Sequence, residues 1–373
     1  MNEVQLLKKL ISIDSQCTKS NKNIVDFIVS LFPAKNCFIT PLKKADLDLY
    51  NLEIKFKGST SGRPLVFSGH TDTVPTSSRW KKDPFLPVVS GNKIYGLGAS
   101  DMKAGVACMI KTAQSLIGKI PACDVIFLFD ADEEGGCTGG KSFMKNIKIK
   151  SGSAKVVVCE PTGGRLRVGQ KGAIEIHATF RGKAFHASRT SFAKNLKLNA
   201  IHKALQGMKE LEKLEKKLEK NKDKQFNFPT QAICRISGGT AVNVIPDECS
   251  FVINRRVLPR ENMDQVVKQI SSCLKKVDPR VEIKIGFFGA PNLLSLNSEL
   301  LKMTKNITKK VWKRTVVAVE PGWTQAGLFK KWGDCLIWGP GEITMAHQAD
   351  EYCPIGDLQK MTTCYKKLIE IQN

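Results

Sequence analysis

Four short apolar segments of the chain are each followed by histidine or acidic residues, three of them directly and the fourth after a glycine-rich loop, and this repeated arrangement limits the possible folds most. The segments are Pro64–Gly69, Val125–Phe129, Lys155–Cys159 and Cys335–Trp338. Their length, apolar character and Gly, Pro or Asp boundaries are typical of buried strands. Between the first two, Asp101–Ile117 has helical spacing. Strands that alternate with helices predict an α/β sheet covered on both faces, and ligands gather where such strands end.

A histidine and an aspartate follow the first of these segments, and a second aspartate lies at the start of the helical one. In SGHTDTVP (residues 68–75), His70 and Asp72 have i, i+2 spacing, so the backbone can fix an imidazole and a carboxylate together. Taken alone, a histidine after a strand is more often a core or capping residue than a metal ligand. Asp101, in YGLGASDMKAG (95–105), lies at a glycine-rich turn just before a helix. Its carboxylate could cap that helix, present an oxygen to a metal, or do both.

The other three segments also lead into candidate ligands. LFDADEEGG (128–136) puts four acids into five positions, and such crowding is hard to explain structurally because the charges repel. Adjacent acids suit two tasks, one binding a cation while the other polarises water. The four acids are Asp130, Asp132, Glu133 and Glu134. Glu160 follows the third segment, and His347 comes after the fourth. Two histidines and several carboxylates, without cysteine, predict an open site for zinc-like ions.

The chain also divides into regions of different character. Residues 1–32 are predicted to be helical. From about Ala173 a strand, a helix over Asn195–Lys220, two strands, a helix and a strand follow within about 110 residues; this β-α-β-β-α-β order is typical of a ferredoxin-like α+β domain. We therefore predict one α/β domain formed by residues 1–175 and 290–373, with residues 176–289 inserted into it.

The motifs, in this order, resemble those of the M20 metallopeptidase family over essentially the whole chain. The resemblance implies a zinc-peptidase-like catalytic domain, whose mixed, partly parallel sheet is covered by helices, and an inserted lid and dimerisation domain. It implies two divalent metal ions, zinc or alternatively cobalt, bound by His70, Asp101, Glu134, Glu160 and His347. By the same resemblance Asp101 bridges the ions, Glu133 is the general base, and Asp72 orients His70.

Further matches occur in the inserted segment and beyond it. His186, in GKAFHASR, corresponds to a histidine that commonly crosses a dimer interface to stabilise an oxyanion. Asn243, Arg256 and Thr324 match substrate-binding positions, and an arginine suits bidentate capture of an α-carboxylate. As isolated residues, Asn243 could be a turn former and Arg256 a solvated strand residue.

Two positions depart from the family pattern. Asn254 stands where an aspartate often precedes the arginine, which alters the local charge balance. Gln325 replaces a usual acidic residue and bears on recognition of the distal part of the substrate.

The resemblance is to the acetylornithine deacetylase branch, through HTDTVP followed by Trp80 and DPF, GLG before Asp101, and GPG with AHQADEY. It implies hydrolytic removal of an acetyl group from N2-acetylornithine, or from a relative such as acetylcitrulline, in arginine biosynthesis. Competing hypotheses are a succinyl-diaminopimelate desuccinylase, a carboxypeptidase or dipeptidase, and a non-catalytic ligand-binding protein on the same scaffold.

The net charge of +23 could indicate a nucleic-acid or acidic partner. Basic residues are spread throughout without a basic block, so we expect solvated lysines and no nucleic acid. The electrostatic field of this positive charge would favour a small anionic acyl-amino-acid substrate. A further hypothesis is that an acidic carrier protein presents this substrate. No apolar run approaches the ~20 residues needed to cross a bilayer, and the twelve cysteines form no C-x-x-C pair. We expect a cytoplasmic homodimer with no membrane association.

Overall fold

The computed structural model of the protein describes residues 1–372, which form two compact units. Unit 1 comprises Met1–Gly169, Leu293–Ala318 and the chain from Thr324 onward, and unit 2 comprises Gln170–Asn292 and Val319–Trp323. The predicted inserted segment, 176–289, lies within unit 2. No helix in the described residues has the length and apolar character needed to span a bilayer.

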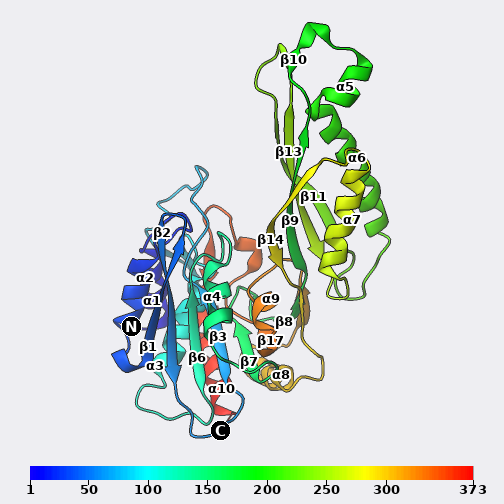
Figure 1. The fold of residues 1–373 in the computed structure, drawn as a ribbon. Coiled ribbons are helices and arrows are strands. Elements are labelled where there is room, and N and C mark those ends of the chain that lie inside the picture. Colours follow the sequence, from blue (N-terminus) through cyan, green and yellow to red (C-terminus); the bar gives the residue numbers. More distant parts are fainter. Residues whose placement is uncertain (373) are drawn as a thin grey trace. The chain divides into compact units, whose positions relative to one another are not determined.

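Unit 1 is built on a mixed sheet (Figure 1), which has nine strands within residues 1–372. The order is β1-β2-β6-β3-β7-β17-β8-β15, with β16 beside β8. The strands are β1 (Cys37–Lys44), β2 (Leu47–Phe56), β3 (Leu65–His70), β6 (Val125–Asp130), β7 (Ala154–Val158), β8 (Leu166–Gln170), β15 (Asn292–Leu293), β16 (Val317–Glu320) and β17 (Gly333–Ile337). Strand β3 is parallel to β6 and β7, and β17 is parallel to β7. The four apolar segments therefore form the parallel centre, as predicted.

Helices cover both faces of this sheet. Helix α10 (Ile355–Glu370) packs on α1 (Glu3–Ile11), α3 (Lys103–Gln114) and α8 (Glu299–Trp312), and its Tyr365 ring lies 5.0 Å from the ring of Phe67. On the other face, Val66 packs in a core with residues of α4 (Thr138–Asn146) and α9 (Ala326–Phe329). Because Val66 and Phe67 are neighbours on one strand, their side chains reach opposite faces. The predicted doubly covered α/β fold is confirmed.

The sequence did not predict several details of the chain path. The predicted helix over residues 1–32 is two helices, α1 and α2 (Lys22–Val29), because the intervening chain follows the loop after β3, where the Ser15 hydroxyl donates to the Thr71 carbonyl at 2.7 Å. The helix predicted over 195–220 is interrupted at Asn199, whose side chain caps α6 (Ala200–Leu218) after α5 (Phe192–Leu198). A small sheet of β4 (Val88–Ser90), β5 (Lys93–Tyr95) and β18 (Tyr352–Pro354) was also not predicted.

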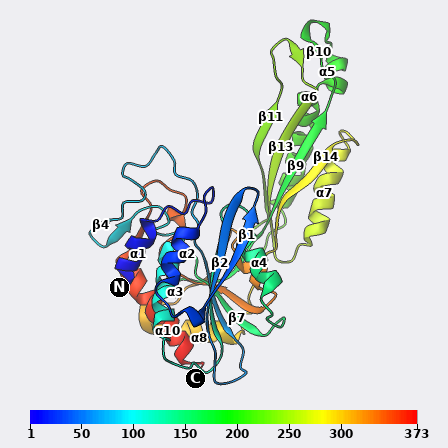
Figure 2. The ribbon, with the colours of Figure 1, turned by 60° about the vertical axis from the view of Figure 1, so that its left-hand side comes forward.

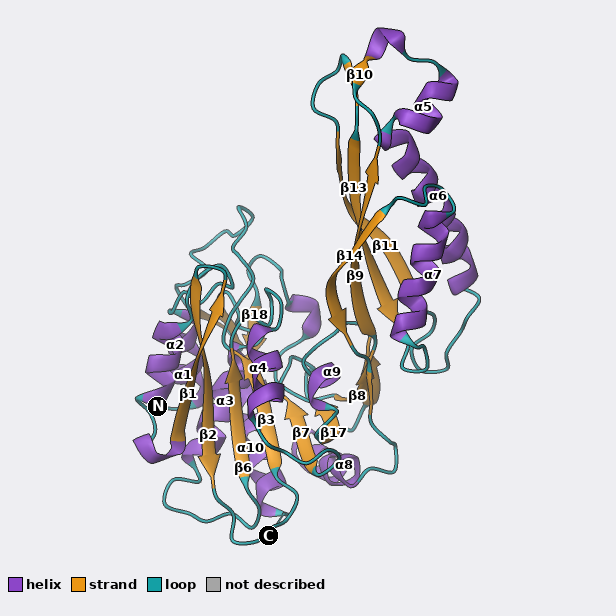
Figure 3. Ribbon diagram, viewed as in Figure 1, coloured by secondary structure: helices purple, strands orange, loops and turns teal. Residues whose placement is uncertain are grey.

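Unit 2 is a four-stranded antiparallel sheet with helices along one face (Figure 3). Its strand order is β11-β13-β9-β14, formed by β9 (Gly172–Arg181), β11 (Thr230–Gly238), β13 (Glu248–Val257) and β14 (Glu282–Gly289). With α6 and α7 (Met263–Lys275), the elements follow one another as β-α-β-β-α-β. Ile174, Ile176 and Phe180 alternate along β9 and are buried in a core with residues of both helices. This alternation is the period-2 pattern of a half-buried strand.

Candidate metal centre

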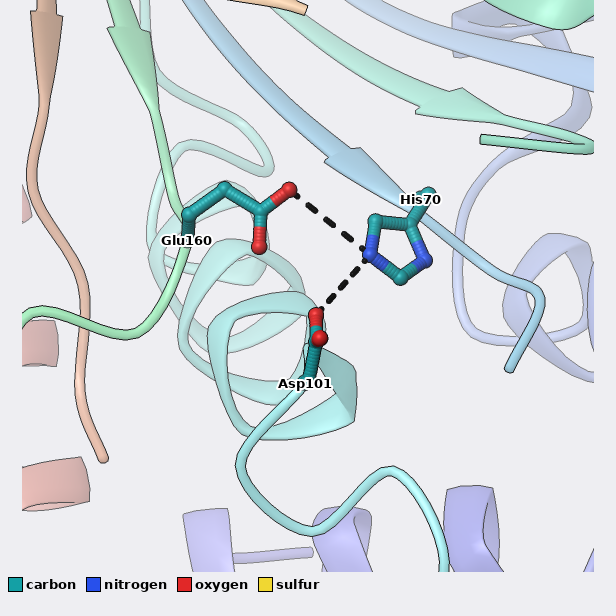
Figure 4. Close-up of side chains that lie close together, drawn as sticks. All are labelled: His70, Asp101 and Glu160. Atoms are coloured by element: carbon teal, nitrogen blue, oxygen red, sulfur yellow. Dashed lines mark hydrogen bonds and ion pairs between the residues drawn. The ribbon is translucent and has the colours of Figure 1, made fainter. Parts of the chain in front are cut away.

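Asp101 lies between two histidines and presents one carboxylate oxygen to each. Its Oδ1 is 3.2 Å from Nε2 of His70, and its Oδ2 is 3.4 Å from Nε2 of His347. Glu160 completes the first group, with Oε1 3.7 Å from the same His70 nitrogen (Figure 4). Glu134 completes the second group, with Oε1 3.1 Å from Nε2 of His347. The two groups therefore share Asp101.

The sheet explains why these residues meet. His70 is the last residue of β3, Glu160 follows β7 by two residues, and Glu134 follows β6 by four. His347 lies on the loop after β17. These four strands are parallel neighbours, so their carboxyl ends lie at one edge. Asp101 reaches the same edge from the loop before α3, where the Asp101–Met102 peptide bond is cis.

Spacing and charge both fit divalent cations at these two groups. In each group the candidate ligand atoms lie within 4.8 Å of one another. Within residues 1–372, the ion pairs formed by Asp101, Glu134 and Glu160 are all with histidines. Three carboxylates and two imidazoles form a mixed oxygen and nitrogen donor set whose surplus negative charge cations would balance.

The pKa values follow from this crowding. Hydrogen bonds to Asp101 and Glu134 raise the pKa of His347 to about 11. Burial favours the neutral acid of Asp101, but its hydrogen bonds with His347 and His70 outweigh burial and lower its pKa. Burial, together with Asp101 and Glu134, raises the pKa of Glu160 well above its ordinary value. The cluster thus attracts positive charge strongly.

Known proteins share this chain's sequence pattern. The model of peptidase family M20/M25/M40 matches residues 66–371, more than half of the chain. The chain belongs to this family. The family resemblance predicted from the motifs is confirmed, and with it a metal-dependent hydrolase that acts on amides.

Curated relatives in family M20 match over most of their length. An acetylornithine deacetylase of Buchnera aphidicola is 29% identical over 378 residues, covering 98% of this chain and 97% of the relative. A succinyl-diaminopimelate desuccinylase of Acinetobacter baumannii is 27% identical over 347 residues, covering 89% of this chain and 88% of the relative.

Solved structures show the same fold. A tripeptidase of Staphylococcus aureus aligns with a TM-score of 0.79 at 21% identity, covering 99% of this chain and 97% of the other. An M20 metallo-carboxypeptidase of Sulfolobus solfataricus also aligns with a TM-score of 0.79, at 18% identity and 99% coverage of both chains. A Bacillus subtilis protein described as a dinuclear metal-binding M20 peptidase has a TM-score of 0.69 at 16% identity, covering 99% of this chain and 97% of the other.

Asp72 connects the His70 loop to the loop that carries the two glutamates. The main-chain carbonyl of Asp72, 2.9 Å away, pairs with Nδ1 of His70, whereas the nearer carboxylate oxygen is 3.7 Å from that nitrogen. The Asp72 carboxylate accepts hydrogen bonds from the amides of Glu133 and Glu134, both at 3.1 Å. Asp72 therefore supports His70 through its backbone and the glutamate loop through its side chain.

Glu351 orders the loop before α3, and our sequence analysis did not single it out. Its buried carboxylate accepts hydrogen bonds from the amides of Gly98, Ser100 and Asp101, at 2.9, 2.7 and 2.7 Å. Because it follows His347 by four residues, it joins the loops that carry two candidate ligands, Asp101 and His347. The signal that could have found it is an acid inside the AHQADEY motif with no assigned ligand role.

Gln325 and Thr324 are both buried and both form hydrogen bonds within unit 1. Gln325 is fully buried, and its Nε2 donates to Oδ2 of Asp130 at 3.1 Å. An acid at this position would face Asp130 as a like charge, so the departure from the family pattern fits the buried packing. Thr324 is 6% exposed, and its hydroxyl oxygen accepts a hydrogen bond from the amide of Ala326 at 3.2 Å.

The remaining predicted residues belong to unit 2 and fall into two places. His186 and Asn243 lie side by side where β10 (Phe185–His186) pairs with β12 (Val244–Ile245), and the Ala187 amide donates to the Asn243 carbonyl at 2.9 Å. Arg256 lies near the far end of β13, where its Nε donates to Oδ1 of Asn254 at 3.0 Å. Residues 248–256 of this strand span roughly 26 Å at about 3.3 Å per residue. The structure therefore separates Arg256 from the other two.

Proposed function

We propose that the protein hydrolyses the acetyl group from N2-acetylornithine, or from a close relative such as acetylcitrulline, in arginine biosynthesis. The observation that carries the proposal is the pair of ligand groups that share Asp101, in a chain that matches an acetylornithine deacetylase over 98% of its length. N2-acetylornithine carries no net charge near pH 7, because its side-chain ammonium balances its α-carboxylate, whereas acetylcitrulline is an anion whose approach the net charge of +23 favours.

Two zinc ions are the proposed cofactors. His70, Asp101 and Glu160 would hold one, and Asp101, Glu134 and His347 the other. Bound there, they would supply Lewis-acid chemistry, making a water more acidic and polarising the acyl carbonyl. Zinc favours such mixed sites of imidazole and carboxylate, and catalytic zinc sites with three protein ligands generally leave a fourth position for water or substrate.

Glu133 is the proposed general base. Burial, with the negative charges of Glu134 and Glu160, raises its pKa well above the ordinary value. A carboxylate with a raised pKa takes a proton from water more readily and can return it to the leaving amine. The Asp72 carboxylate holds the Glu133 amide, which fixes the base beside the candidate ligand Glu134.

A substrate panel tests the reaction. Zinc-reconstituted enzyme would be assayed on N2-acetylornithine, acetylcitrulline, succinyl-diaminopimelate and a set of dipeptides, with amine release as the measurement. We expect the highest kcat/KM on the first two. A higher value on the succinyl compound would favour the desuccinylase hypothesis, and a higher value on dipeptides would favour a peptidase.

The variant Glu133→Gln separates catalysis from binding. It should keep its metal content, measured by atomic emission, and lose about 100- to 10,000-fold in kcat because the proton acceptor is gone. Full activity in this variant would exclude Glu133 as the base. A metal-loaded protein that binds acyl-amino acids but releases no amine from any of them would support a ligand-binding role instead.

We also propose that the protein acts as a homodimer in which unit 2 supplies His186 to the partner. Arg256 and His186 are separated along β13 by more than a small amino-acid substrate can bridge, so one copy cannot place both on one substrate. Exposed apolar side chains suited to an interface lie on α5, on α6 and on the edge strand β11: Phe192, Leu205 and Ile236, which are 78%, 47% and 56% exposed.

A further inference from the structure

Lys44, at the end of β1, reaches the loop that follows β6. Its ammonium Nζ lies 2.5 Å from Oδ1 of Asp132 and donates to the Gly135 carbonyl at 2.8 Å. The Asp132 side chain is fully buried, while that of Lys44 is 36% exposed. Strand β1 packs against α4, the helix that begins directly after this loop (Figure 2).

Asp132 is the centre of a closed turn formed by residues 132–138, here called the Asp132 turn. Its Oδ2 accepts hydrogen bonds from the Thr138 hydroxyl at 2.5 Å and the Thr138 amide at 3.4 Å. Its carbonyl accepts from the amides of Gly136 and Cys137 at 3.1 and 2.5 Å. Its φ of +64° is left-handed, a conformation that a non-glycine residue keeps only where its surroundings hold it.

The turn carries Glu133 and Glu134, so its shape sets where both carboxylates lie. A buried carboxylate is strongly unfavourable without a compensating charge or hydrogen bonds. Lys44 provides that charge to Asp132 and at the same time holds the Gly135 carbonyl, which lies directly after Glu134. The ammonium thus contacts the turn on both sides of the two glutamates.

We propose that Lys44 is a positioning residue for the reaction, acting through Asp132 to hold Glu133 and Glu134 in place. The inference rests on the proposed function in taking Glu133 as the base and Glu134 as a metal ligand. It adds a residue from the β1–β2 hairpin, which contributes none of the predicted ligands or the base. Lys44 itself contacts neither histidine of the centre in the described structure.

Two variants and a neighbouring control test this role. Lys44→Met removes the charge with little change in length, and Lys44→Arg keeps it. Lys43→Met is the matched control, because Lys43 is the adjacent residue and pairs with Asp48 at 2.7 Å on the surface, with the two side chains 71% and 57% exposed. The first measurement is hydrogen–deuterium exchange of residues 132–138 in metal-free protein, and the second is kcat and KM of the zinc-loaded enzyme.

We expect Lys44→Met to speed exchange in the Asp132 turn and to lower kcat about 10- to 100-fold with a smaller change in KM, the usual cost of losing an outer support of a metal site. Lys44→Arg should keep both the exchange rate in the Asp132 turn and kcat close to the wild-type values, and Lys43→Met should match the wild type. Unchanged exchange in the turn, or a kcat equal to that of Lys43→Met, would overturn the proposal.

If Lys44→Met exchanges faster throughout the chain, the arginine variant decides. Near wild-type kcat in Lys44→Arg then supports the role of the charge, and a loss as large as in Lys44→Met overturns it. Faster exchange confined to the turn, combined with full activity of Glu133→Gln, would refute the proposed base and leave the contact between Lys44 and the turn intact.

Discussion

The predicted site residues of the two units are held in opposite ways. In unit 1, His70, Asp101 and Glu160 are at most 8% exposed, and the exposed His347 contacts both Asp101 and Glu134. Their loops are joined by contacts between distant parts of the chain. In unit 2, His186 is exposed, and its ring nitrogen Nδ1 pairs with the nearby Ser188, at 2.7 Å from the hydroxyl and 3.2 Å from the amide. The candidate ligands of unit 1 thus lie together within one copy of the chain, whereas Arg256 of unit 2 lies apart from His186 and Asn243.

This difference predicts that substitutions of site residues in the two units will affect different properties of the enzyme. A substitution of one of the five candidate metal ligands in unit 1 should change metal content, because those side chains contact one another. Substitution of His186 in unit 2 should leave metal content unchanged and alter turnover alone. Three variants test the comparison, beginning with the one expected to have the largest effect on catalysis.

Asp101→Ala removes the carboxylate that both ligand groups share. We expect loss of metal from both groups and a decrease in kcat/KM of at least about 1,000-fold, because the Lewis-acid contribution to catalysis is several kcal/mol. Metal content and activity measured on the same sample check this. Retention of one full equivalent of tightly bound metal with substantial activity would show that Asp101 does not join the two groups.

His186→Ala removes the proposed oxyanion donor from unit 2. We expect metal content to stay at the wild-type level and kcat to fall about 100- to 1,000-fold. Mixing this variant with Glu133→Gln provides a sharper test, because in a mixed dimer one copy supplies the histidine and the other the intact base. If subunits exchange freely, about a quarter of the sites should regain activity, since half the dimers are mixed and each has one competent site. No recovery after exchange would contradict action across the dimer.

The sequence predicted residues that stand in local motifs better than residues that act through contacts between distant segments. The residues His70, Asp101, Glu134, Glu160 and His347 were identified because each stands in a distinctive local motif at the end of an apolar segment or just before a helix. The residues that hold these loops in place, Glu351 and Lys44, were not predicted. They act through contacts between distant segments, such as the hydrogen bond from the Asp101 amide to Glu351. Local spacing carries no signal for such pairs.

The helix boundaries show the same limit. Hydrophobic spacing extends smoothly from residue 195 to 220, yet the helix is interrupted where Asn199 caps the next turn with its own side chain. Residues 12–21 also leave the helical path, because Cys17 donates its amide to the carbonyl of Thr73 at 2.8 Å. Tertiary contacts outweigh local helical preference at both positions.

The smallest expected effect on catalysis comes from a buried ion pair within unit 2. The Lys203 Nζ lies 2.6 Å from Oδ2 of Asp278 and also donates to the Arg181 carbonyl at 2.8 Å. Burial alone would raise the pKa of Asp278, but hydrogen bonds from Lys203 and from the Arg280 amide outweigh it and lower that pKa. The paired carboxylate therefore stabilises the fold above the ordinary aspartate pKa of about 3.9. That contribution is lost as the pH falls below this value and through the lowered pKa.

Asp278→Asn should lower the free energy of unfolding at pH 7 by about 3 kcal/mol, because it leaves the Lys203 ammonium buried without a counter-charge. It should also weaken the dependence of stability on pH below about 4. Urea unfolding between pH 3 and pH 7 measures both effects, and kcat of the folded enzyme should stay within about twofold of wild type. Glu210→Gln, which removes a solvent-screened partner of Lys213 on α6, is the control and should change stability little. A large fall in kcat for Asp278→Asn, with metal fully bound, would contradict this prediction. It would show that the Lys203–Asp278 pair contributes to turnover as well as to the stability of unit 2.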